Sequence, residues 1–134
     1  MHPTFYATVL FVLLASPVSP TFGAEPISVS VCDIGADPGR FEGADVSVHG
    51  AIYVGEDATN MSDPTCAGIA IQLSVSDEAY RHKDIRAFER EVRKYGMRAT
   101  ATVDGQFHAK SPFHSFPVPT IDMHAIKGVV FEAK

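Results

Sequence analysis

Apolar and polar residues alternate along several segments after residue 24, and this period of two predicts β-strands. The clearest segment covers residues 46–54. One of its faces carries Val46, Val48, Gly50, Ile52 and Val54, and the other carries Ser47, His49, Ala51 and Tyr53. The same period recurs over residues 69–75, 97–107 and 121–133. Each of these segments therefore predicts a strand with one face turned toward a core.

Three further segments carry shorter signals. Residues 27–31 alternate between apolar residues and serines, which predicts either a short strand or the first turn of a helix. A polar connection follows residue 54, and it has room for a short strand near residues 58–62. Within the segment 97–107, the pair Asp104-Gly105 predicts a turn.

The period changes to that of an α-helix between residues 77 and 95. Ser76 is a residue type that caps helix N-termini, and Asp77 and Glu78 follow it in the first turn, where the helix dipole favours acids. One apolar stripe is formed by Ile85, Phe88, Val92 and Tyr95. Gly96 provides a C-terminal stop. The order of elements predicts a mainly β fold: a five-stranded OB-like Greek-key barrel with one α-helix between strands 3 and 4.

Residues 1–23 have the pattern of a signal peptide. The apolar run over residues 7–15 is too short to span a bilayer, which needs about 20 apolar residues. Small residues then lead to a predicted cleavage between Gly23 and Ala24. The alternative is a buried N-terminal helix. We expect residues 24–134 to form a single OB-like domain without a transmembrane span, located in the periplasm or secreted.

The chain has two cysteines, Cys32 and Cys66, and both follow the predicted leader. In an oxidising compartment, an even pair of cysteines predicts a disulfide. The bridge would close a loop of about 34 residues, which stabilises the fold by ~3–4 kcal/mol in the chain-entropy model. The alternative is two reduced, buried thiols.

A pattern of cysteines, glycines and alternating valines runs through residues 28–75. Its members are Cys32, Pro38, Phe41, Gly43, Val46, Val48, Gly50 and Cys66. The pattern resembles that of small exported OB-like proteins of bacteria, which are mostly uncharacterised. The resemblance implies the fold and the export, and it implies no particular activity.

The net charge of −5 is distributed unevenly. Residues 25–78 contain ten acids and one base, whereas residues 79–134 contain ten bases and six acids. Six bases lie on or beside the predicted helix: Arg81, Lys83, Arg86, Arg90, Arg93 and Lys94. They form either a solvated helix face or a surface for an anionic partner. The overall acidity argues against a dedicated nucleic-acid binder, because such proteins carry a basic footprint.

Two alternatives to a simple binding module are a metal site and a catalytic site. Imidazoles bind transition metals, so His108, His114 and His124 form an alternative metal site, although no two of these histidines have the HxH or HxxxH spacing. Catalysis by a nucleophile requires a serine or cysteine beside a base, and the chain has no GxSxG stretch and no phosphate-binding loop. We therefore predict no enzymatic activity, no cofactor and no metal as the first choice.

OB-folds bind their ligands on the face of strands 2 and 3. On this chain, we expect a ligand to contact His49, Tyr53 and Gln72, whose side chains on that face can stack on a ligand or form hydrogen bonds with it. The sequence as a whole predicts an exported, non-enzymatic binding or interaction module of the bacterial cell envelope, with an unknown envelope partner or an anionic ligand. The alternative is a periplasmic metal-binding protein that uses histidines, and the third choice is an oligonucleotide or oligosaccharide binder.

Overall fold

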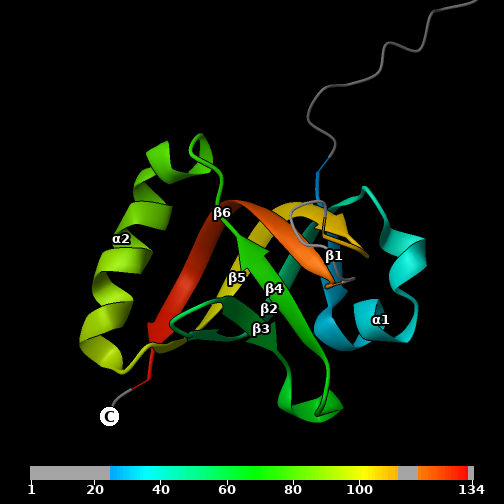
Figure 1. Ribbon diagram of the computed structural model, residues 1–134, viewed down its shortest axis with the longest axis horizontal. Coiled ribbons are helices and arrows are strands. Elements are labelled where there is room, and N and C mark those ends of the chain that lie inside the picture. Colours follow the sequence, from blue (N-terminus) through cyan, green and yellow to red (C-terminus); the bar gives the residue numbers. More distant parts are fainter. Residues whose placement is uncertain (1–24, 112–117, 133–134) are drawn as a thin grey trace, which may run out of the picture.

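Five strands close into a barrel in the computed structural model, which describes residues 25–111 and 118–132 (Figure 1). The strands are β2 (Asp45–Val54), β3 (Thr59–Ser62), β4 (Ala70–Ser74), β5 (Arg98–His108) and β6 (Thr120–Phe131). They pair in the order β2-β3-β4-β6-β5, and β5 pairs again with β2. Only the β4–β6 pair is parallel within this ring. Closure gives each of the five strands a neighbour on both sides, which removes free edges from the ring.

The first part of the described chain forms a short strand that is followed directly by a short helix. β1 (Ile27–Ser30) pairs in parallel with the first half of β2, while β3 pairs with the second half of the same edge. Helix α1 (Val31–Ala36) follows at once. The Ser30 hydroxyl accepts a hydrogen bond from the Asp33 amide at 3.0 Å, and the Asp33 carboxylate accepts one from the Ser30 amide at 3.4 Å. This capping box ends the strand and starts the helix at one residue.

The mainly β barrel with a helix is confirmed, but its strands are not the five that were predicted. The short strand for which the sequence left room near residues 58–62 is present as β3, whose Met61 is fully buried, and it belongs to the ring, whereas β1 lies outside it. The predicted helix position, between the third and fourth strands, is not confirmed. Along the chain, α2 (Lys83–Val92) follows β4 and precedes β5. Among all six strands β4 is the fourth, because β3 adds one strand to the count, and within the ring of five it is the third.

The predicted helix is divided into pieces. The Ser76 hydroxyl accepts a hydrogen bond from the Ala79 amide at 3.1 Å, so it caps the turn that precedes the short 3₁₀ helix η3 (Ala79–Arg81), rather than α2. His82 is extended and separates η3 from α2. Another 3₁₀ helix, η4 (Arg93–Tyr95), follows α2 and ends at Gly96, whose φ of 72° is left-handed, so the predicted stop is confirmed.

The core fills the barrel, and α2 extends it along one side, opposite α1 (Figure 1). The buried side chains of α2 are Ile85, Phe88 and Val92, as the apolar stripe predicted. Tyr95, also predicted in that stripe, is exposed and stacks on Phe131 at 4.8 Å between ring centroids. In the described part of the chain, no helix is both long and apolar enough to cross a membrane.

The prediction of a turn at Asp104-Gly105 is wrong, because β5 continues through both residues. Gly105 lies at a shift of register between β5 and β6. A Cβ atom at Gly105 would overlap the carbonyl oxygen of Asp122 and would lie 2.8 Å from the Ile121 side chain. The glycine therefore serves the close approach of two strands rather than a reversal of the chain.

Candidate ligand-binding face

One row of outward side chains crosses four neighbouring strands of the barrel. Tyr53 of β2 lies opposite Arg98 of β5 on one side and opposite Asn60 of β3 on the other. Asn60 in turn lies opposite Gln72 of β4. Residues that are paired in this way point to the same face of a sheet. We call Arg98, Tyr53, Asn60 and Gln72 the Tyr53 row.

The Tyr53 ring is the exposed aromatic centre of this row, with 52% of the residue accessible. The Arg98 guanidinium lies 5.5 Å from the ring centroid, within the range of a cation–π contact. This contact restrains the ring without covering it completely. A depression of about 240 Å³ adjoins the ring, and its lining also includes Ser62 and Glu132. An aromatic surface beside hydrogen-bonding groups can hold a ligand that has both apolar and polar faces.

The other predicted member of the face, His49, is placed at some distance from the row. It lies four residues before Tyr53 on β2, which corresponds to about 13 Å along a strand. Its Nδ1 atom is 3.1 Å from the hydroxyl of Thr102 on β5. The structure therefore brings Tyr53 and Gln72 into one row and leaves His49 further along the same face. Asn60 and Arg98 were not predicted, because only the strand register places them beside Tyr53.

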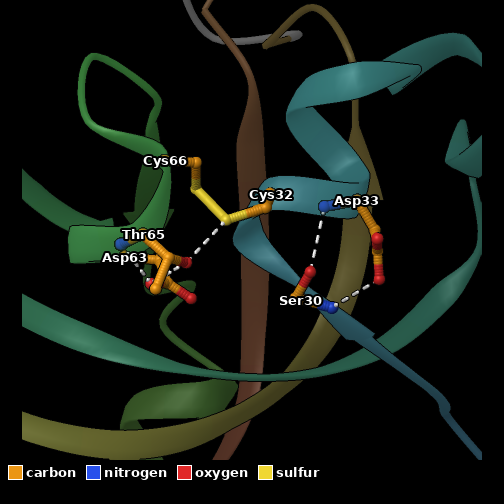
Figure 2. The surroundings of a disulfide bond; sticks show 6 residues. All are labelled: Ser30, Cys32, Asp33, Asp63, Thr65 and Cys66. Atoms are coloured by element: carbon orange, nitrogen blue, oxygen red, sulfur yellow. Dashed lines mark hydrogen bonds between the residues drawn. A yellow bond between two sulfur atoms is a disulfide. The ribbon is translucent and has the colours of Figure 1, made fainter.

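The predicted disulfide between Cys32 and Cys66 is confirmed, with 5.5 Å between the two Cα atoms (Figure 2). It joins α1 to the 3₁₀ helix η2 (Pro64–Cys66). Asp63 starts η2, since its carboxylate accepts hydrogen bonds from the hydroxyl and the amide of Thr65 at 2.7 and 2.9 Å. These bonds stabilise the ionised carboxylate and lower the pKa of Asp63. The turn thus presents Cys66 to Cys32, and the Thr65 hydroxyl lies 3.3 Å from the Cys32 sulfur.

The six bases of the predicted anionic-partner helix are all exposed, but two of them have acidic partners. Lys94 and Arg90 approach one oxygen of Glu91 at 3.2 and 3.3 Å. Their hydrogen bonds lower the pKa of Glu91, with that from Lys94 the larger cause. The other four of the six, Arg81, Lys83, Arg86 and Arg93, form no ion pair with any residue in the described part of the chain. Over Lys83–Val92, three bases and three acids cancel, so α2 by itself carries no net charge.

The histidines of the alternative metal site occupy different places. His108 has its Nδ1 atom 3.5 Å from a carboxylate oxygen of Glu42. Its partner in the β5–β6 register is Thr120, four residues from His124, or about 13 Å along β6. His114 lies outside the described residues. His124 instead faces a polar depression that also contains His82.

Comparison with known proteins shows the fold alone. No family model and no curated protein matches the chain. Among solved structures, OBody AM3L09 bound to hen egg-white lysozyme is similar over 82% of this chain and all of that one, with 16% identity and a TM-score of 0.54. A putative aspartyl-tRNA synthetase from Leishmania major Friedlin is similar over 90% of this chain and 24% of that one, with 12% identity and a TM-score of 0.50. The barrel is therefore OB-like.

Proposed function

We propose that this protein is an exported, non-enzymatic binding module of the bacterial cell envelope, and that its ligand lies across the Tyr53 row. The observation that carries the proposal is the alignment of an exposed aromatic ring with an arginine and two amides on four adjacent strands. The similar OBody supports a binding role, because that protein is bound to lysozyme.

The Tyr53 row lies on the face where OB-folds usually bind their ligands. The face of the second and third barrel strands is their usual ligand surface. In the ring of this chain these strands are β3 and β4, which contribute Asn60 and Gln72. The row contains one cation, Arg98, and the protein has a net charge of −5, so a polyanion such as nucleic acid is not the expected ligand. A neutral polar chain, of which an oligosaccharide is the simplest example, suits the ring and the amides better.

Replacing Tyr53 by alanine is expected to weaken ligand binding at least tenfold, which corresponds to about 1.4 kcal/mol. The reason is that the ring is the largest exposed apolar surface of the row. Binding would be measured by ¹⁵N NMR titration with soluble peptidoglycan disaccharide-peptides, chitohexaose and an oligothymidylate. Saturable shifts are expected for a saccharide probe, centred on Tyr53, Asn60 and Gln72.

Tyr80→Ala is the matched control, because Tyr80 is 48% exposed and lies on η3, away from the row. It should leave the affinity unchanged. Equal loss of affinity in both variants, or shifts that are centred elsewhere, would contradict the proposed face. Saturable binding of the oligothymidylate alone would replace the saccharide with a nucleic acid.

The exported location has its own test. Residues 1–23 lie outside the described residues, so the proposal of a removed leader is supported by their apolar pattern and by the disulfide, which persists in oxidising compartments. The intact mass of protein recovered from the periplasm or medium of an expressing bacterium should correspond to a chain that begins at Ala24 or within a few residues of it. A full-length product in the cytosol would contradict export.

A further inference from the structure

A polar depression of about 430 Å³ lies between η3 and β6, apart from the Tyr53 row. Its lining contains two carboxylates, Glu78 and Asp122, and two imidazoles, His82 and His124. The remaining lining residues are Ser76 and Ala79. Two acids and two histidines around a single hollow form a set of side chains that coordinates transition metals.

The two ends of η3 and the strand β6 each contribute one carboxylate and one imidazole to the lining of the depression. Asp122 and His124 are two residues apart on β6, so they point to the same face of the strand. Glu78 and His82 flank η3 at its two ends, and both line the depression, although His82 is extended. The depression therefore has one acid–histidine pair from β6 and one from the two ends of η3.

We propose that this depression binds one divalent transition-metal ion, for which Zn²⁺ is the probe, through His82, His124 and the two carboxylates. Imidazole nitrogen and carboxylate oxygen are both ordinary zinc ligands. Glu78 and Asp122 together supply two negative charges, which balance the charge of the ion. No lysine or arginine lines the depression to compete with a cation.

The four side chains can close on an ion because little else holds them. In the described part of the chain, the side chains of Glu78, His82 and His124 form no hydrogen bond or ion pair, and all three residues are exposed. Asp122 accepts a long hydrogen bond, 3.5 Å, from the Ser74 hydroxyl, which leaves its second oxygen available. A ligand set of this kind moves inward at the cost of side-chain entropy rather than backbone strain.

The depression is wider than an ion, and no three ligand atoms of its side chains lie within 4.8 Å of one another. Within residues 25–111 and 118–132, the one group of three His, Cys, Asp or Glu ligand atoms that meets this distance is formed by Cys32, Asp63 and Cys66. Both sulfur atoms of that group are joined in the disulfide and are not available as thiolates. The space between η3 and β6 has room for an ion and several waters, since each water occupies about 30 Å³. Water therefore completes the coordination.

Isothermal titration of the untagged protein with ZnCl₂ in a non-coordinating buffer tests the site. We expect one equivalent to bind, with the dissociation constant raised at least tenfold in His82→Ala and again in His124→Ala. His49→Ala and His108→Ala are matched controls, because each removes a described histidine elsewhere, and they should bind zinc as the unaltered protein does. Substoichiometric Ni²⁺ should broaden the amide resonances of residues 78–82 and 122–124 first.

Several results would overturn the site. Unchanged zinc affinity in both His82→Ala and His124→Ala would show that any bound zinc lies elsewhere, as would broadening centred on another histidine. Absence of zinc binding to the unaltered protein would also overturn the site. Glu78→Gln and Asp122→Asn preserve side-chain size, so loss of affinity in these variants with an unchanged circular dichroism spectrum would support coordination and exclude misfolding. Tyr53→Ala should leave zinc binding intact, which separates this site from the proposed ligand face.

Discussion

Replacing Cys32 by serine is expected to lower the free energy of unfolding by roughly 2–4 kcal/mol. The Cys32–Cys66 bridge spans 34 positions of the sequence, so its loss frees a large loop in the unfolded chain. It also releases α1 from η2, and α1 follows a strand that is paired on one side only in the described part of the chain. Because small domains are stabilised by about 5–15 kcal/mol in total, the loss would be a large fraction of the stability. Urea denaturation monitored by circular dichroism measures it.

The second cysteine provides the internal control for this expectation. Cys66→Ser should cost about as much as Cys32→Ser, and the double variant should lose no more than either single variant, because all three remove the same bond. Additive losses would show that the two side chains act independently. Two titratable thiols in the denatured, unreduced protein would contradict the bridge directly.

Replacing Gly105 by alanine is expected to destabilise the barrel by about 3 kcal/mol, at the upper end of the cost of inserting one carbon into a packed site. The new Cβ would overlap the Asp122 carbonyl oxygen, which belongs to the backbone of β6 and cannot rotate away. It would also press on Ile121, which is fully buried. The barrel must then separate β5 from β6 locally or shift their register. Denaturation gives the stability, and hydrogen exchange of the β5 and β6 amides shows where pairing is lost.

Gly39→Ala is the matched control, because nothing lies within 4 Å of a Cβ atom at that position. Its stability should stay within about 0.5 kcal/mol of the unaltered protein, as is usual for a surface substitution. If Gly105→Ala were equally neutral, Gly105 would be a residue of a flexible turn, as Asp104-Gly105 suggests in the sequence, and the close strand contact would be wrong.

The sequence by itself determined the elements whose signal is local. The alternation over residues 46–54 placed Val46, Val48 and Ile52 inside the barrel, because neighbouring side chains of a strand must point to opposite faces. The spacing of Ile85, Phe88 and Val92 identified the buried stripe of α2 for the corresponding helical reason. The disulfide followed from the number of cysteines, since the chain has only two that can pair.

Only the tertiary structure decided which strands close the barrel. The four residues of β3 contain one apolar side chain, Met61, so the sequence left room for a short strand there without assigning it to the barrel. They form a strand because β2 and β4 offer hydrogen-bonding edges on both sides. The role of Gly105 was likewise invisible, because the chain beside it belongs to a segment 17 residues later. A dipeptide that favours turns in isolation is overruled when a neighbouring backbone fills the space.

The composition of the two proposed sites depends on tertiary structure for the same reason. Arg98, Tyr53, Asn60 and Gln72 become one row through the register of three strand pairs, and register depends on the closure of the whole barrel. The depression of His82 and His124 depends on the packing of η3 against β6, about 40 residues apart in the sequence. Local periodicity specifies which face of an element a side chain occupies. Which side chain of another element lies opposite it is set by contacts between distant parts of the chain, and these form only when the barrel closes.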